Sequence, residues 1–418
     1  MSSFGHASRR FALWVVRLLL ALAAAILICA LVFALGALRV TYPLRAATKA
    51  ASDPPAPREI RGAIHIHSTL SDGRGTPSQI ALAAKAAGLQ FIIMTDHNLR
   101  TLTEPTYEHG VLVISGVELS TKKGHLVVIG TPRGLARADP DAVRRSQELG
   151  GIAILAHPVQ RKAPWTDARN ATRADGMELY SADSLFRDAL HRPFTLLAPA
   201  AMAYLTNPIH ALMILNREQP DAVRKLLEIS ARRPKLALCA HDSHGFPPYE
   251  LAFRSFSVHI PLTDKLQGGL PADPSEAAGA VIDVIARGGS YCAFDPLGPA
   301  EGFAIDGLRG ESRRAAVGDR LTVQIPPLAA APVRVQIWGG ARLEPDGRTV
   351  VIERGGPLQI EVWVEAPAIL FGTTWKPWIV PSPVFASMGT ASSDSTTVSG
   401  ESSASSGSPA TGDAPGTR

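Results

Sequence analysis

The sequence predicts an α/β barrel that follows a transmembrane helix and precedes a small all-β sandwich. Between residues 60 and 298, short β-type runs alternate with helical stretches, a pattern typical of an α/β barrel. A long uncharged apolar block lies before this region, and short alternating strands follow it. The 418 residues also exceed the ~100–200 residues of one ordinary domain, which favours more than one folded part.

The first element is the apolar block at residues 18–38, after a basic leader at residues 1–17. It carries no charge and is long enough for one crossing, because a bilayer core requires about 20 apolar residues. Basic residues flank both ends, so their count alone does not fix the orientation. We expect a single-pass anchor in the inner (cytoplasmic) membrane with the remainder in the periplasm. A cleaved signal peptide is the alternative, although its apolar region usually spans only ~7–15 residues.

A Pro-rich linker at residues 39–59 then leads into the predicted barrel, residues 60–298. Three helices are marked by a capping residue before proline and a glycine after the last turn. They begin at Thr76-Pro77, Asp139-Pro140 and Asp273-Pro274 and end before Gly88, Gly150 and Gly288. The long apolar stretch at residues 194–215 is interrupted by prolines, so a helical insertion is favoured over a second membrane span.

The C-terminal part of the sequence has a different pattern of residues. Residues 302–385 contain short alternating strands with a Pro345-Asp346-Gly347 turn, which predicts a β-sandwich. Residues 386–418 are rich in Ser, Thr and Gly and predict a disordered tail, because they have too few apolar side chains for a core.

Composition sets limits on partners and on disulfides. The net charge of +5 comes from scattered basic residues, so no nucleic acid partner is expected. Cys239 and Cys292 lie in apolar strand-like runs without CxxC spacing. We expect both to be buried thiols rather than parts of a disulfide framework.

Ionisable residues gather at the ends of the predicted strands. In a barrel, the carboxyl ends of the strands converge on one face, where active sites form. His65 and His67, two residues apart, should point to the same side of their strand. The predicted set contains six of the twelve histidines and three carboxylates: His65, His67, Asp72, His97, Glu118, His125, His157, Asp242 and His244.

A single histidine in a strand is more often a core or surface residue than a ligand. Burying so many ionisable groups together without a cation would be costly, however, so the set predicts a metal site. Imidazoles with carboxylates suit zinc, manganese or iron better than calcium, which prefers oxygen ligands alone. We expect His241 to act, if at all, as a support for these ligands.

Five motifs, "HIHSTLSDG", "MTDHN", "GVELS", "AHP" and "HDSH", resemble in order and spacing the PHP (polymerase and histidinol phosphatase) domain over residues 60–298. The resemblance implies a distorted seven-stranded TIM-like barrel with two to three divalent metals at its mouth. It assigns His65, His67, Glu118 and Asp242 to the first metal and to catalysis. Glu118 would bridge to a second metal held by His125 and His157, and Asp72, His97 and His244 would hold the third. The strands after the barrel also resemble the β domain of membrane-anchored PHP proteins.

This resemblance implies hydrolysis of a phosphate mono- or diester by a metal-activated hydroxide, with a small phosphorylated substrate and a membrane contact through the N-terminal helix. Arg100, Arg161 and Lys162 follow two of the motifs and are candidate phosphate ligands; solvated loop charges are the equal alternative. An amidohydrolase-type metal enzyme also begins with a His-x-His strand. A non-catalytic envelope module that binds a ligand and retains metal is the remaining alternative.

Overall fold

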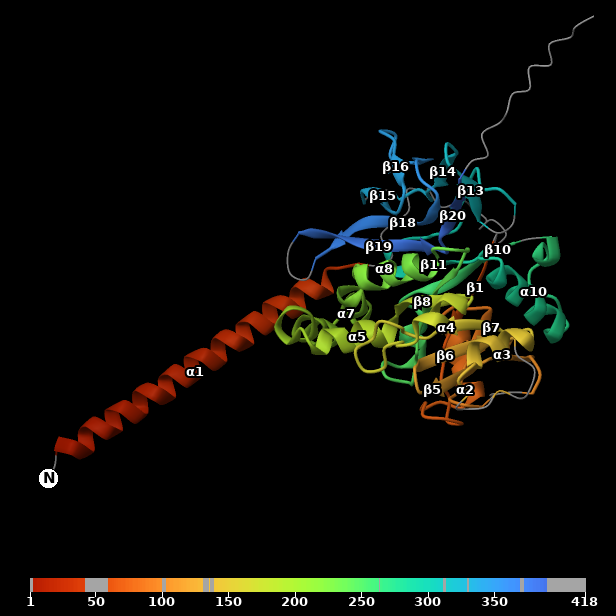
Figure 1. The fold of residues 1–418 in the computed structure, drawn as a ribbon. Helices are drawn as coiled ribbons and strands as arrows, with labels where there is room; N and C mark the ends of the chain where they lie inside the picture. The colour runs from red at the N-terminus through yellow and green to blue at the C-terminus, as the bar shows by residue number, and fades with distance from the viewer. Residues whose placement is uncertain are drawn as a thin grey trace, which may run out of the picture. The chain divides into compact units, whose positions relative to one another are not determined.

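The structure is a computed structural model that describes residues 3–41, 59–99, 103–130, 135, 139–262, 264–310, 313–328, 331–368 and 372–388. Most of the predicted linker, residues 42–58, and the predicted tail from residue 389 onward lie outside the described residues. The chain is a mixed α/β protein with one long apolar helix at its N-terminal end (Figure 1).

The α/β region contains two sheets. The first runs in the order β11 (Tyr291–Ala293), β10 (Ser257–Pro261), β1 (Glu59–Ile64), β2 (Phe91–Met94), β4 (Val111–Ser115), β3 (Thr106–Glu108). The second runs in the order β5 (Val117–Thr121), β6 (Gly124–Ile129), β7 (Ile152–Leu155), β8 (Gly176–Ser181), β9 (Leu236–Ala240). Strands β1, β2 and β4 are parallel, as are β7, β8 and β9.

Two isolated bridges connect these sheets just beyond their strands. One joins His97 to Glu118 and the other joins Ile66 to Ser243. The chain segments that leave β1, β2 and β9 therefore come together beside β5. This is the part of the fold that gathers the predicted metal ligands.

The apolar run at residues 111–119 does not form one strand, as its pattern predicts, but two strands in different sheets. The chain changes sheet at Gly116. A Cβ atom at this position would lie 2.7 Å from the carbonyl oxygen of Val128, so only glycine allows the backbones to approach this closely.

The three capped helices form where the sequence predicts them. Helix α2 (Pro77–Ala86) has a complete capping box between Thr76 and Gln79, and the side chain of Asp273 caps α10 (Pro274–Ala286). Helix α3 (Ala142–Glu148) begins two residues after the predicted proline. The other helices of this region are α4 (Ala168–Arg173), α8 (Pro220–Ile229) and α9 (Tyr249–Phe253).

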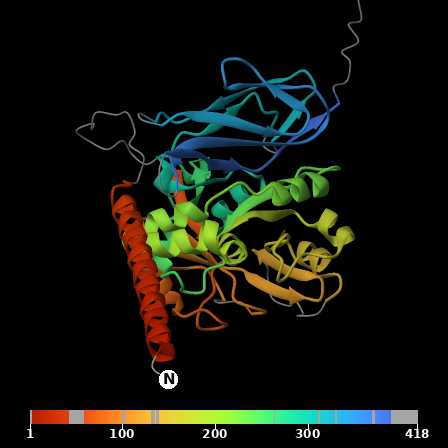
Figure 2. The same cartoon turned by 90° about the vertical axis from the view of Figure 1, so that its left-hand side faces the viewer.

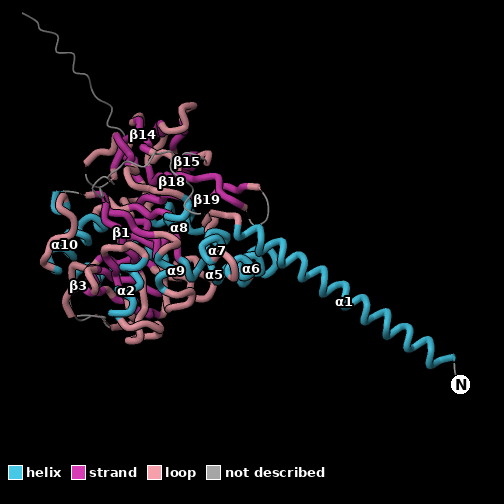
Figure 3. The backbone as a smooth tube through the Cα atoms, turned by 180° about the vertical axis from the view of Figure 1, so that it is seen from behind, coloured by secondary structure: helices cyan, strands magenta, loops and turns pink. Residues whose placement is uncertain are grey.

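The apolar stretch at residues 194–215 is a helical insertion rather than a continuous long helix. The insertion comprises α5 (Ala182–Leu190), the π-helical turn η1 (Pro193–Leu197), α6 (Ala198–Tyr204) and α7 (Pro208–Leu215). In the described part of the chain, one helix is long and apolar enough to cross a membrane: Arg9–Leu38, within α1 (Ser3–Leu38), which contains an 18-residue window with a mean hydropathy of 3.1. The insertion lies against the end of α1 (Figure 3).

The strands after residue 302 lie on one side of the α/β region (Figure 2). One sheet has the order β12 (Ala304–Asp306), β14 (Arg320–Gln324), β17 (Thr349–Ile352), β16 (Ala341–Leu343). The other strands are β13 (Arg314–Ala316), β15 (Val333–Trp338), β18 (Gly356–Pro367), β19 (Thr373–Pro381) and β20 (Val384–Ser387). Because β19 pairs with β11, these strands continue the first sheet of the α/β region.

The expectation for the two later cysteines is wrong, because Cys239 of β9 and Cys292 of β11 form a disulfide. Both residues are buried, and their Cα atoms are 6.0 Å apart. The two strands belong to different sheets and are 53 residues apart in the sequence. Sequence spacing therefore carried no sign that they meet.

A buried ion-pair network links β1, β10 and the segment after β11. The His259 ring donates from Nδ1 to Glu59 (2.8 Å) and from Nε2 to Asp295 (3.0 Å). Burial alone would lower the pKa of His259, but hydrogen bonds to these two carboxylates raise it from 6.5 to about 8. The imidazolium form therefore stabilises the fold.

This network predicts a pH-dependent stability. The contribution of His259 should be complete below its unfolded pKa and should disappear as the pH rises through about 8. We expect His259→Gln to destabilise the protein by about 2 kcal/mol more at pH 6 than at pH 9. Unfolding of both proteins at the two pH values tests this, and an equal destabilisation at both would contradict it.

Candidate metal centre

The nine predicted ligands come together in one cluster at the junction of the two sheets. Each of the nine has a ring nitrogen or carboxylate oxygen within 4.0 Å of another member. They come from the segments after β1, β2, β7 and β9 and from strands β5 and β6. The structure therefore brings together every residue of the predicted set.

The innermost group consists of His65, His67, Glu118 and Asp242, all buried. Glu118 Oε2 lies 3.3 Å from Nε2 of both histidines. Asp242 Oδ1 lies 3.4 Å from His65 Nε2 and 3.3 Å from His67 Nε2. Two imidazoles and two carboxylates thus face one small space, and this is the set that the resemblance assigns to the first metal.

The other oxygen of Glu118 faces two further histidines. Glu118 Oε1 lies 2.8 Å from Nδ1 of His125 and 3.2 Å from Nε2 of His157. His97 also approaches, with its Nδ1 3.0 Å from Glu118 Oε2. A candidate cation position is therefore formed by Glu118, His125 and His97, whereas the resemblance assigns His97 only to the third position.

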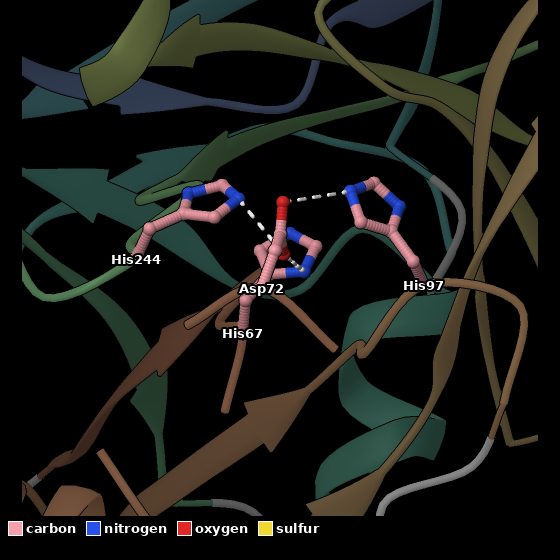
Figure 4. A group of neighbouring side chains, drawn as sticks. All are labelled: His67, Asp72, His97 and His244. Atoms are coloured by element: carbon pink, nitrogen blue, oxygen red, sulfur yellow. Dashed lines mark ion pairs between the residues drawn. The ribbon is translucent and has the colours of Figure 1, made fainter. Parts of the chain in front are cut away.

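The outermost group surrounds Asp72 (Figure 4). Its Oδ1 lies 3.3 Å from His244 Nε2 and 3.5 Å from His67 Nδ1, and its Oδ2 lies 3.6 Å from His97 Nε2. His67 is an addition to the predicted set for this position. With its side chain 53% exposed, Asp72 makes this the most open part of the cluster.

The backbone departs from regular strand where it presents several ligands. Strand β1 ends at Ile64, so His65 and His67 do not share a continuous strand as their spacing predicted. Positive φ angles occur at His65 (65°), His157 (32°) and Asp242 (48°). Such values are unfavourable for residues other than glycine and are commonly found at functional sites.

Asp96 holds the loop that carries Asp72. Its carboxylate accepts hydrogen bonds from the Ser68 backbone N–H (2.7 Å), the Ser68 hydroxyl (2.9 Å) and the Ser71 hydroxyl (2.6 Å). The turn between His67 and Asp72 is therefore fixed from the neighbouring strand.

Glu178 is a residue that the sequence reasoning missed. This buried carboxylate lies 2.5 Å from His65 Nδ1 and accepts a 2.7 Å hydrogen bond from the His157 backbone N–H. Binding Nδ1 directs Nε2 of His65 towards Glu118 and Asp242, the usual arrangement behind a metal ligand. The signal was a glutamate inside the apolar run "GMELY", because buried glutamates nearly always have a partner.

His241 does not support the ligands as expected. Its Nε2 donates to the Phe256 carbonyl (3.1 Å), and its ring stacks on the Phe256 ring. Burial lowers the pKa of His241 to about 4, so it is a neutral residue of the core.

Charge and unpaired atoms favour a cation in this cluster. Burial would lower the pKa of His65, but Glu178, Glu118 and Asp242 raise it well above the ordinary value. Burial would raise the pKa of Glu118, but His65, His125 and His157 hold it well below the usual range. Several buried atoms have no hydrogen-bond partner among the described residues: His65 Nε2, His67 Nδ1 and Nε2, His97 Nδ1 and Glu118 Oε2. Nitrogen and oxygen donors left open in this way fit divalent transition metals.

Two of the three predicted phosphate ligands, Arg161 and Lys162, lie in the described part of the chain. Arg161 and Lys162 are exposed on the loop after β7. Within the described residues, no hydrogen bond or ion pair connects them to the nine ligands. Arg100 lies outside the described residues.

No family model and no curated protein matches the chain. Solved structures that are similar to it include three with the following descriptions. A two-domain protein from Bacteroides vulgatus containing a predicted PHP-like metal-dependent phosphoesterase is 14% identical, with a TM-score of 0.40, over 82% of this chain and 100% of that one. A candidate metal-dependent phosphoesterase from Bifidobacterium adolescentis is 16% identical, with a TM-score of 0.27, over 46% and 90%.

The third is an amidohydrolase from Chromobacterium violaceum with bound sulfate and no metal. It is 15% identical, with a TM-score of 0.28, over 44% of this chain and 87% of that one.

Proposed function

We propose that this chain is a membrane-anchored, metal-dependent phosphoesterase of the PHP type. The observation that carries the proposal is the position of Glu118, whose two oxygens face five imidazoles within 3.3 Å. A shared carboxylate between two sets of nitrogen ligands is the arrangement expected of a site that binds neighbouring cations. In this proposal the two bridged sheets form the distorted barrel, and the C-terminal strands form a sandwich that covers it.

In this proposal, each group of ligands would hold a different cation. His65, His67 and Asp242 would hold one cation with Glu118, and His125 and His157 would hold a second on the other side of this carboxylate. Asp72, His97 and His244 would hold a third. Bound zinc, manganese or iron would supply a positive charge that polarises a phosphoryl oxygen and lowers the pKa of a water molecule.

The protein side chains position these groups and accept protons. Glu178 fixes the His65 ring through Nδ1, which keeps Nε2 free for coordination. Asp72 and His244 are the most exposed members of the cluster, so a phosphate ester should enter from their side. The proposed substrate is a small phosphorylated molecule, and the anchor would place the site outside the cytoplasm.

The test uses the full-length protein in detergent, stripped of metal and then loaded with manganese or zinc. Hydrolysis of 4-nitrophenyl phosphate is measured beside bis(4-nitrophenyl) phosphate, and bound metal is measured by elemental analysis. We expect hydrolysis of one ester and its loss in His97→Ala. The matched control is His109→Asn, which changes an exposed histidine with a positive φ that asparagine tolerates.

The outcomes separate the alternatives. Metal bound at the cluster without hydrolysis of either ester would contradict the phosphoesterase and favour a binding module. Hydrolysis of an amide substrate but of neither ester would favour an amidohydrolase.

A further inference from the structure

A cavity of about 420 Å³ lies beside the outermost ligands. Asp72, Asp242 and His244 line one part of it. Apolar side chains of α5, η1, α6 and α7 make up most of the remaining wall, among them Phe186, Leu197 and Leu212. The proposed reaction centre therefore opens directly onto a largely apolar space.

The part of this cavity nearest the ligands also holds an ion pair. Asp183 pairs with Arg187 one turn later on α5, and Gln160 donates to the Asp183 carboxylate at 3.1 Å. Burial and the negative charge of Asp242 raise the pKa of Asp183. Asp183 and Arg187 line the same cavity as Asp72, Asp242 and His244.

The apolar wall of the cavity is shared with the packing surface of α1. Ala200 and Leu215 line the cavity and belong to the same buried cluster as Phe33 and Ala37 of α1. Figures 1 and 3 show the insertion against the end of α1 that leads into the α/β region. Residues that line the cavity therefore belong to the same buried cluster as the end of the candidate membrane helix.

Hydrogen bonds hold the insertion to α1 at this point. The Asn207 side chain donates to the carbonyls of Ala37 (3.0 Å) and Val40 (2.9 Å). The Thr206 hydroxyl lies 3.4 Å from the Ala34 carbonyl. These contacts satisfy carbonyls that the end of a helix leaves open, so α1 and the insertion meet at a defined position.

The insertion also exposes large apolar side chains. Phe194 is 88% exposed and Leu205, next to Thr206, is 84% exposed. Phe246, on the loop after His244, is 66% exposed and lines the cavity. Apolar side chains exposed beside a membrane helix are typical of a surface that enters the lipid interface.

We propose that the cavity holds the hydrocarbon chain of an amphiphilic phosphate ester drawn from the bilayer that α1 spans. The inference rests on the proposed function and gives its substrate class. The phosphate would lie at Asp72 and His244 and the chain among α5, α6 and α7. Water would form the new O–P bond, the ester P–O bond would break, and the alcohol carrying the chain would leave with the proton.

The first test measures binding rather than turnover. The full-length protein in lipid nanodiscs, loaded with manganese, is titrated with ethyl, butyl and hexyl phosphonate. Each methylene that enters an apolar site should strengthen binding about fourfold, so hexyl phosphonate, with four more methylenes, should bind about two hundredfold more tightly than ethyl phosphonate. Equal affinities for the three would overturn the inference.

A pair of matched variants tests where the hydrocarbon chain of the ligand binds. Ala201 of α6 is exposed and lines the cavity, whereas Ala198 of the same helix is exposed and does not. Ala201→Trp should remove most of the dependence on chain length, and Ala198→Trp should preserve it. Both should bind as much manganese as the wild type. A full dependence in Ala201→Trp would show that the chain binds elsewhere.

A competition experiment tests the source of the ligand. Hexadecyl phosphonate placed in the bilayer of the protein's own nanodisc should weaken hexyl phosphonate binding at least tenfold, whereas the same lipid in separate nanodiscs should not. No effect from either would mean that ligands enter from solution, which contradicts the membrane source.

Failure of the inference and failure of the proposed function give different results. Binding that depends on chain length, without hydrolysis of either nitrophenyl ester, would contradict only the phosphoesterase. Hydrolysis with binding that is independent of chain length would contradict only the assignment of the cavity.

Discussion

Replacing Glu118 by glutamine should reduce kcat/KM for the ester by at least about a thousandfold, because the charge stabilisation lost is worth several kcal/mol. Glutamine keeps the size of the side chain but removes its negative charge. It also presents an amide N–H₂ group to imidazoles that now face two carboxylate oxygens. We therefore expect Glu118→Gln to bind less manganese than the wild type as well.

Elemental analysis of the loaded protein and ester hydrolysis check this prediction together. The matched comparison is Glu178→Gln, which changes another buried glutamate of the same sheet that binds Nδ1 of His65 and the His157 backbone N–H. Its loss should be smaller, about tenfold to a hundredfold, as for groups that orient a metal ligand. A Glu118→Gln protein with the full metal content and a rate within tenfold of the wild type would exclude Glu118 from the centre.

The sequence was most informative about metal-binding residue types that stand at the ends of apolar runs. These residue types predicted nine residues that lie together in the structure, because parallel strands bring their carboxyl ends to one edge. Helix ends were equally clear at Thr76 and Asp273, since an N-terminal cap depends on residues within one turn.

Features that depend on distant contacts could not be predicted in this way. The switch of sheets at Gly116 is set by the close approach of the Val128 carbonyl. The end of β1 at Ile64 results from the left-handed backbone of His65. Strand β10 has little local signal, because "SVHIP" is short and carries a histidine whose partners, Glu59 and Asp295, lie far away in sequence.

The disulfide is the second feature for which we expect a large effect. Its two cysteines are 53 residues apart in the sequence, and in the chain-entropy model a loop of this length stabilises the folded state by about 4 kcal/mol. The double variant Cys239→Ala, Cys292→Ala should lose approximately this much of the free energy of unfolding. A reducing agent should destabilise the wild type similarly and leave the double variant unchanged.

The same disulfide also bears on the proposed location of this domain outside the cytoplasm. Cys239 lies three residues before Asp242, so the disulfide ties the strand that carries a proposed ligand to β11. Disulfides persist in oxidising compartments and are rare in the cytosol. Trapping free thiols in intact cells therefore tests whether the disulfide forms and on which side of the membrane this domain lies. Two protected cysteines are expected if α1 exports the chain. Two reactive thiols in the folded protein would contradict both the disulfide and the export of this domain.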